Sequence, residues 1–149
     1  MDPMLGFRFR LLLGTEDIGF MRVSGLSTHV GEMVWEEIND TVTGKKLPDR
    51  LTFDDITLSR GVDNSHALVD WYADVVEVLK QSDGGVWGLR DIRRSVSIQV
   101  IQKAAQSVAT FQIYSAWPKS LNWSDLNAVD SSVFVESLVL AHEGIRRVL

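Results

Sequence analysis

Residues 28–37 read Thr28-His29-Val30-Gly31-Glu32-Met33-Val34-Trp35-Glu36-Glu37, and this stretch is apolar on two sides. Its apolar residues alternate with a period of two, which is typical of a β-strand. Val30 and Val34 share one face with two glutamates, whereas Met33 and Trp35 fall on the other face. Because neither face is purely polar, the stretch suits a sheet that is covered on both sides, for instance by neighbouring subunits.

Further strands are predicted on both sides of this stretch, because the two-residue period recurs along most of the chain. The segment from Ile38 to Arg50 is rich in Asn, Asp, Thr, Gly and Lys, and it indicates a long loop or an extended hairpin. A second polar loop is expected from Lys119 to Asp130, after a strand that ends at Trp117-Pro118. The remaining strands are expected at residues 7–13, 18–24, 51–61, 95–100, 111–117 and 133–143.

One segment has helical periodicity. Asp63-Asn64-Ser65 offers three candidate N-cap residues, and apolar side chains then follow at spacings of three and four. The apolar positions are Leu68, Trp71, Tyr72, Val75 and Leu79. The sequence therefore predicts one domain over residues 1–149, mainly β, built as a β-barrel or two-sheet sandwich of roughly seven strands with one flanking α-helix.

Length and composition narrow the possible functions. The 149 residues match one ordinary domain, and the formal net charge of −5 argues against a general nucleic-acid binder, which needs a basic surface. The absence of cysteine excludes disulfides, cysteine-ligated zinc and a cysteine nucleophile. No stretch approaches the roughly 20 apolar residues of a membrane helix, so we expect a cytoplasmic protein without stable membrane association.

Motifs that carry chemistry are not evident. His29, His66 and His142 are far apart in sequence and form no paired metal-binding spacing. Adjacent carboxylates, as in Asp54-Asp55, face opposite ways in a strand and are predicted to be surface charge. No nucleophile elbow and no phosphate-binding loop is present. We therefore expect no enzymatic activity, no catalytic or metal-binding residue and no cofactor.

Three sets of motifs resemble one family, in the same order along the chain. The first set is Phe7-Arg8-Phe9 followed by the stretch from Gly19 to Leu26. The second set begins with Lys46-Leu47-Pro48. It continues with Asp55-Ile56-Thr57-Leu58-Ser59-Arg60-Gly61 and a helix that contains Trp71. The third is Ala116-Trp117-Pro118, then Leu126-Asn127-Ala128, and then the stretch from Val135 to Gly144. Together they resemble the tail-tube proteins of contractile phages and of extracellular contractile injection systems.

The chain also departs from the family pattern at several positions. Asp49 follows Pro48 where the family commonly has Gly, and Ser115 stands where Asn often precedes Ala-Trp-Pro. Ile38-Asn39-Asp40 replaces a Gly-rich turn, and the turn around Lys103-Ala104-Ala105-Gln106 lacks the usual Asp-Gly type. These departures bear on the role within the tail rather than on the family.

The resemblance implies a structural role in a phage tail or a released phage-tail-like particle. Family members form hexameric rings whose sheets join edge to edge, and the rings stack into a tube inside a contractile sheath. The implied partners are further copies of the chain, the sheath protein, baseplate or tube-initiator proteins, terminator proteins, and nucleic acid or protein cargo in the lumen.

Contacts between subunits are expected from the segment between Gly31 and Arg50, because its charges and aromatic residues suit an interface. Trp71 is predicted to be core, whereas two other tryptophans are interface candidates. The predicted contact residues are Trp35, Glu36, Glu37, Asp40, Lys45, Lys46, Arg50 and Trp123.

Two alternatives stay open. A tube-initiator, adaptor or terminator subunit shares the fold but needs only one competent ring face. A ligand-binding or enzymatic β-barrel predicts instead a monomer with a concave apolar pocket and converging polar groups.

Overall fold

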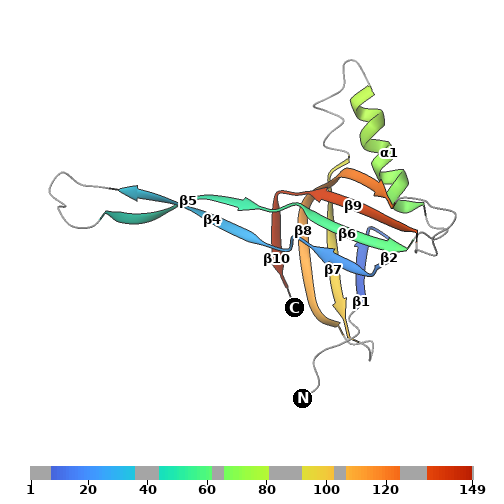
Figure 1. The fold of residues 1–149 in the computed structure, drawn as a ribbon, viewed down its shortest axis with the longest axis horizontal. Helices are drawn as coiled ribbons and strands as arrows, with labels where there is room; N and C mark the ends of the chain where they lie inside the picture. The colour runs from blue at the N-terminus through green and yellow to red at the C-terminus, as the bar shows by residue number, and fades with distance from the viewer. Residues whose placement is uncertain are drawn as a thin grey trace.

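The computed structural model describes residues 8–35, 44–61, 66–80, 92–102, 107–124 and 134–148, and these form ten strands and a long helix (Figure 1). The elements are β1 (Arg8–Leu13), β2 (Glu16–Phe20), β3 (Arg22–Ser24), β4 (Thr28–Trp35), β5 (Lys45–Phe53), β6 (Ile56–Gly61), α1 (Ala67–Lys80), β7 (Arg94–Ile101), β8 (Ser107–Trp123), β9 (Val135–Ala141) and β10 (Gly144–Arg147).

Eight of the described strands form one antiparallel sheet that closes on itself. The order is β2-β1-β7-β8-β9-β6-β3. Strand β10 pairs with the first half of β8, and β9 pairs with the second half. The two end strands, β2 and β3, are consecutive in the chain and are separated only by Met21. The Met21 N–H donates to the Ser59 carbonyl of β6 at 3.0 Å. The chain therefore passes from one end of the sheet to the other in a single step, and the predicted barrel or sandwich is confirmed.

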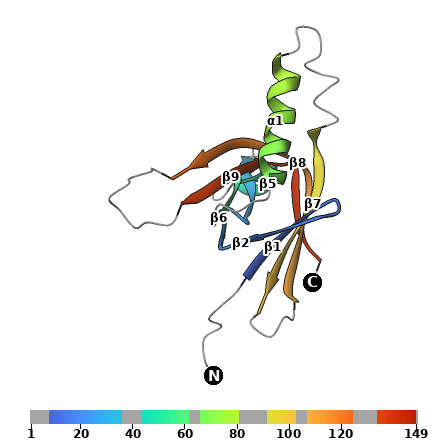
Figure 2. The same ribbon diagram turned by 90° about the vertical axis from the view of Figure 1, so that its right-hand side faces the viewer.

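Strand β8 holds the two halves of the barrel together. Its first half pairs with β7 and its second half pairs with β9, and Figure 2 shows β8 changing direction between them. At the change, Ser115 has a φ of 52°, and the register with β7 shifts between Arg94 and Val96. This bulge explains why Ile113 and Ala116 are both buried although they are three residues apart.

The expected strand end at Pro118 is wrong. Strand β8 continues to Trp123, and Pro118 is buried opposite Leu140 of β9. Among the described strands this half of β8 pairs only with β9, so its other edge is unpaired. A proline is tolerated in such an edge strand, because its missing N–H removes no backbone hydrogen bond on the unpaired side. A second register shift lies between Pro118 and Ser120. The part of the predicted polar loop from Lys119 to Trp123 is therefore strand, and residues 125–130 lie outside the described residues.

The core lies inside the closed sheet, under the alternating apolar residues of its strands. Leu11, Ile98 and Ile113 come from β1, β7 and β8, and Leu58 and Leu138 face them from β6 and β9. All five side chains are fully buried. Burying a large aliphatic side chain contributes about 1.5–3 kcal/mol, so this shared interior is the main source of stability.

The interior also holds an ion pair. Arg60 and Glu136 are opposite each other in the register of β6 and β9, both are buried, and Arg60 Nη2 lies 3.4 Å from Glu136 Oε2. A buried pair of this kind favours the register in which the two charges meet, because any slip would leave a charge alone in the core.

Helix α1 covers the barrel beside β8 (Figure 2). Leu68, Trp71 and Val75 are buried, as the helical period predicts, and Trp71 Nε1 donates to the Ile92 carbonyl at 3.0 Å. The prediction that Leu79 faces the core is wrong, because its side chain is 68% exposed in the last turn. The N-cap candidates Asp63, Asn64 and Ser65 lie outside the described residues.

Strands β4 and β5 form a separate two-stranded sheet that projects from the barrel as an arm (Figure 1). The sequence predicts a loop or an extended hairpin over residues 38–50, and the structure shows the hairpin, with β5 beginning at Lys45. The predicted strand over 18–24 divides at Met21, and the predicted last strand continues into β10, which the sequence pattern did not indicate.

Gly25 directs the chain from β3 toward this arm. It has a φ of +88°, and a Cβ at this position would lie 2.0 Å from the Asp55 carbonyl oxygen. The backbones that enter and leave the arm therefore approach each other more closely than a residue with a Cβ at position 25 would allow.

Replacing Gly25 with Ala should destabilise the fold by at least ~3 kcal/mol, because it combines a left-handed φ with a backbone collision. Gly14 is a matched control, since its φ is +61° but no atom lies within 4 Å of the place that a Cβ would occupy. Gly14→Ala should cost only about 1 kcal/mol. Urea unfolding measures both, and equal costs would contradict the close approach at Gly25.

Ser115→Asn should stabilise the protein by about 0.5–1 kcal/mol, because Asn tolerates the left-handed conformation better than Ser. The φ of 52° at Ser115 gives a physical reason for the Asn that the resemblance of the sequence leads us to expect at this position. Ser115→Ala, which has no such tolerance, is the control in the same unfolding experiment. A loss of stability in the Asn variant would show that the bend is held in another way.

Candidate assembly surface

The hairpin of β4 and β5 exposes an unusual amount of apolar surface. Every residue of β4 is exposed, and so is every residue of β5 except Phe53. Trp35 is 50% exposed and Val30 is 62% exposed. Half of the large exposed hydrophobic residues of the described chain lie here, namely Val30, Met33, Val34, Trp35, Leu47 and Leu51. An apolar arm of this kind is typical of a surface that other chains cover.

The register of the hairpin divides these residues between two faces. Met33 lies opposite Leu47, and Trp35 follows on the same face. Val30 lies opposite Leu51 on the other face, nearer the barrel. Val34 shares the face of Val30 and lies beyond Met33 along β4. The apolar residues of the arm are therefore on opposite sides, so a single flat partner surface cannot cover both.

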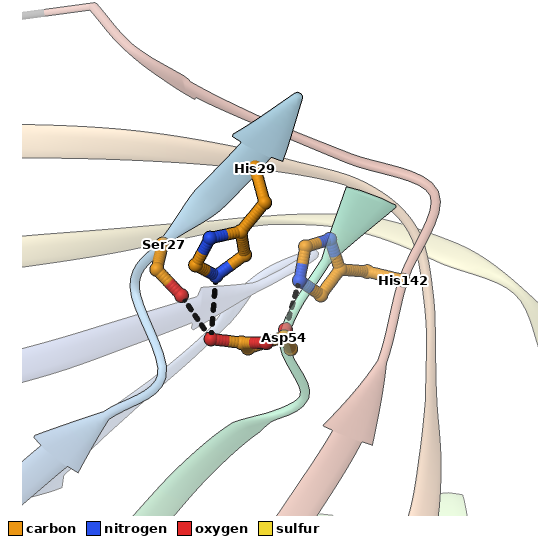
Figure 3. A network of polar contacts seen from close by, with 4 residues as sticks. All are labelled: Ser27, His29, Asp54 and His142. Atoms are coloured by element: carbon orange, nitrogen blue, oxygen red, sulfur yellow. Dashed lines mark hydrogen bonds and ion pairs between the residues drawn. The ribbon is translucent and has the colours of Figure 1, made fainter. Parts of the chain in front are cut away.

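The hairpin is anchored to the barrel at its root. Asp54, which directly follows β5, accepts hydrogen bonds at Oδ2 from Ser27 Oγ and from His29 Nε2, the latter at 3.0 Å (Figure 3). The backbone carbonyl of Asp54 accepts a third bond from His142 Nε2 at 2.9 Å. Ser27 directly precedes β4, His29 lies in β4, and His142 lies in the turn between β9 and β10. We refer to Ser27, His29, Asp54 and His142 as the root network.

Electrostatics favour the charged form of Asp54. Hydrogen bonds from Ser27 and then from His29 lower the pKa of Asp54 below its ordinary value of 3.8. A lowered pKa means that the carboxylate contributes fully at neutral and mildly acidic pH, and that this contribution is lost only as the pH falls below the ordinary value. The root network therefore keeps its acceptor throughout the range in which histidine changes charge.

Further contacts surround the root. Lys119 Nζ of β8 lies 3.0 Å from Asp55 Oδ2, and Arg93 Nη1 lies 3.1 Å from Glu143 Oε1. The ring of Phe53 packs at 5.5 Å from the ring of His142. The single strand expected over residues 51–61 is wrong, because Asp54 and Asp55 lie between β5 and β6. The two carboxylates bind partners from different segments.

The predicted contact residues are found in two places. Trp35, Lys45, Lys46 and Arg50 are all exposed on the hairpin, while Trp123 is 49% exposed at the end of β8 in the barrel. Glu36, Glu37 and Asp40 lie outside the described residues. Lys46 Nζ is 3.6 Å from Glu32 Oε1 of the same hairpin, so this lysine already has a partner within the subunit.

Sequence reasoning did not find the root network. His29 and His142 are 113 positions apart in sequence, and no spacing rule connects them. The one signal lay in the family phrases, because the phrases containing Gly25, Asp55 and His142 all meet at the root. Their convergence indicates that the attachment of the arm is a specified feature of the fold.

Two cavities lie in the described part of the chain. One cavity of about 270 Å³ beside α1 is lined by Val75, Leu79, Ile92, Arg93 and Trp117, and its one charged group in that lining binds Glu143. A second, of about 390 Å³, is shallow and opens at the barrel end between Phe9, Met21 and Arg60. Within the described ranges, no three His, Asp or Glu side chains are grouped to hold a metal ion. The described helices include none that is long and apolar enough to span a membrane.

Solved structures share this fold over almost the full chain. A chain of the six-fold symmetrised baseplate of the anti-feeding prophage is 22% identical, covers 99% of this chain and 97% of its own length, and has a TM-score of 0.75. A chain of the sheath–tube complex of the extracellular contractile injection system PVC is 21% identical over 97% of this chain and 90% of its own, with a TM-score of 0.75.

A chain of the sheath/tube terminator of the same PVC system is similar to the same degree. It is 21% identical, covers 100% of this chain and 99% of its own, and has a TM-score of 0.76. No curated protein matches the chain. The family model of the T4-like virus tail tube protein gp19 matches residues 5–146. Because that match covers nearly the whole sequence, the resemblance is confirmed, and the chain belongs to the family of T4-like virus tail tube proteins.

Proposed function

We propose that this protein is the subunit of the inner tube of a contractile phage tail or phage-tail-like injection particle. Copies of the chain, each a single tail-tube domain, join into hexameric rings, and the rings stack into a hollow tube inside a contractile sheath. The observation that carries the proposal is the hairpin of β4 and β5, which is apolar on both faces and packs on no core within the described chain.

The two faces of the hairpin support contacts with two neighbours. The cluster of Met33, Trp35 and Leu47 and the pair of Val30 and Leu51 lie on opposite sides. An arm placed between two further copies would bury both sets, one against the adjacent subunit and the other against the adjoining ring. Burial of apolar area contributes about 25 cal/mol per Å², so covering both faces gives the assembly its driving force.

Open sheet edges support ring formation. In the described chain, β10 pairs only with β8, and the second half of β8 pairs only with β9. Unpaired strand edges are a liability in a monomer, because they offer free N–H and C=O groups to any strand. In a ring each edge is covered by the next copy, and a rotation that closes limits the addition to a fixed number of subunits.

Charged groups are proposed to set the register between rings. Lys45 and Arg50 are exposed on the arm, and Glu36, Glu37 and Asp40 follow β4 in the sequence. Pairs of this kind at the rim of an interface contribute mainly to specificity. Trp123, which lies on the barrel, is proposed to meet a neighbouring subunit at a separate place.

The role is mechanical, with no catalytic step. The tube would be driven through a target envelope when the sheath shortens, and it would conduct nucleic acid or protein cargo. The proposed partners are the sheath, baseplate or initiator proteins and a terminator, which accords with the sheath–tube and baseplate structures of similar fold. Assembly would take place in the bacterial cytoplasm.

A capping or initiating subunit is the second candidate. The fold is shared equally well by a chain from a tube terminator structure and by one from a tube cap structure. Such a subunit needs one competent ring face, whereas a main tube subunit needs two. Electron microscopy of the purified protein separates them, since stacked rings or filaments indicate a tube subunit and single rings indicate a cap.

Trp35→Asp should give folded protein that no longer assembles, because a charge replaces an exposed aromatic side chain of the arm. Trp35→Tyr keeps an aromatic contact and should assemble like the wild type. Negative-stain microscopy and light scattering measure assembly, and circular dichroism checks the fold. Wild-type assembly by the Asp variant would contradict the assignment of the arm as an interface.

A further inference from the structure

Two strand edges on opposite sides of the barrel are unpaired in the described part of the chain. One half of the closed sheet runs in the order β2, β1, β7, first half of β8, β10. Among the described strands β2 pairs only with β1, and β10 pairs only with β8, so each has one open edge (Figure 1). An open edge presents unpaired N–H and C=O groups, to which a strand of another chain can bind.

The two edge strands run in the same direction, as the cross-strand register shows. One row across the five strands consists of Asp17, Leu12, Ser97, Gln112 and Arg146. The next row begins with Ile18 of β2 and ends with Arg147 of β10. The residue numbers of β2 and β10 therefore rise together from row to row. A rotation about an axis along the strands keeps this direction, so β2 of a neighbouring copy in a ring would lie parallel to β10.

Opposite charges stand at the two ends of the first row. The side chain of Asp17 on β2 is 47% exposed, and Arg146 on β10 is exposed as well. Residues that are opposite each other in a sheet lie on the same face. Leu11 and Ile98 of the next row are buried in the core, so Asp17 and Arg146 lie on the face away from the core. One edge of this face therefore ends in a carboxylate and the other in a guanidinium group.

We propose that β10 of one copy pairs in parallel with β2 of the next copy, and that Arg146 meets Asp17 across this junction. The inference rests on the proposed tube function and names the contact that closes its rings. Because the two partners contribute different edges, the contact is heterologous, which is the type that builds rings. A two-fold contact between two β10 edges would instead bring arginines together, and one between two β2 edges would bring carboxylates together. The charges therefore favour the heterologous junction.

Asp17 can accept Arg146 of the next copy while it keeps its contact within the subunit. Arg10 Nε lies 3.0 Å from Asp17 Oδ1. A carboxylate offers about four acceptor positions on its two oxygens, so a second guanidinium group can bind without displacing the first. The β2 edge is also accessible at this end, because β2 approaches β6 beside Phe20, and Asp17 lies near its opposite end.

The position of the arm supports the same arrangement. His142 Nε2, in the turn just before β10, lies 2.9 Å from the Asp54 carbonyl oxygen at the root of the arm. Figure 1 shows the arm projecting from the β10 side of the barrel, away from β2. A copy that places its β2 edge against β10 therefore lies on the side to which the arm extends, so one neighbour can receive both contacts.

Charge reversal and rescue test the junction. Arg146→Glu should raise the protein concentration at which rings form by about 5–10-fold, because every contact of the ring then brings two carboxylates together. Arg146→Glu combined with Asp17→Lys exchanges the two charges and should return this concentration to within about threefold of the wild type. Lys80→Glu is the matched control, since it makes the same change of charge at an exposed residue of α1 and should assemble like the wild type. Sedimentation velocity measures assembly, and circular dichroism checks the fold.

Cross-linking locates the junction directly, because the chain has no cysteine of its own. In one subunit residues 17 and 146 are separated by four strand spacings, roughly 19 Å, which is too far for a disulfide. Asp17→Cys with Arg146→Cys should therefore link different copies on oxidation and give a ladder on a non-reducing gel that ends at the ring. Glu77→Cys with Arg146→Cys is the control pair, because residue 77 is exposed on α1 and away from both edges, and it should give no ladder.

The outcomes separate this junction from the tube function on which it rests. Impaired assembly of Arg146→Glu, rescue by Asp17→Lys and a disulfide ladder support the junction. Wild-type rings together with unimpaired Arg146→Glu, absent rescue or absent cross-links would overturn it and leave the tube function standing. A wild-type chain that stays monomeric at every concentration would overturn both.

Discussion

The structure depends on one constraint: a two-stranded ribbon with apolar side chains on both faces has no interior of its own. The barrel satisfies its apolar residues by closing the sheet, with Leu11, Ile98 and Leu138 completely buried inside. The arm of β4 and β5 has no equivalent, and Val30, Met33 and Trp35 remain in water in the isolated subunit. Nothing in the described part of the chain removes this surface from water, and we propose that another chain does so on assembly.

The attachment of the arm follows from the same constraint. An arm that meets other subunits must point in a fixed direction, because small angular errors at its root become large displacements at its tip. The close approach at Gly25 and the hydrogen bonds of Asp54 supply that rigidity from three separate segments of the chain. The remaining charged contacts nearby, such as Lys119 with Asp55, lie at the surface and contribute little individually.

Much of the barrel could be predicted from sequence, because burial on one face leaves a two-residue period and burial of a helix face leaves a 3.6-residue period. The positions of Leu11, Ile98 and Trp71 follow directly from these periods. The wrong predictions concern residues whose surroundings in the folded chain override the local sequence pattern. Pro118 did not end β8, because that half of the strand has an unpaired edge among the described strands. Leu79 is exposed because it lies in the last turn of α1, beyond the buried residues Leu68, Trp71 and Val75.

The candidate site was only partly accessible to sequence reasoning. Trp35 and its neighbours could be identified, because a strand that is apolar on both faces is itself a local pattern. The root network could not, since His29, Asp54 and His142 are brought together by strand pairing across the whole chain. Ser115 is an intermediate case, where a departure from the family pattern was visible but its meaning required the left-handed φ.

Hydrogen exchange of the backbone amides in β4 and β5 tests the central claim most directly. In the dispersed subunit these amides should exchange much faster than those of β7 and β8, because nothing among the described residues covers the arm. In the assembled particle their exchange should slow by at least ~10-fold, while the barrel core changes little. Equally fast exchange of the arm in both states would show that its apolar faces are not the surfaces on which the assembly is built.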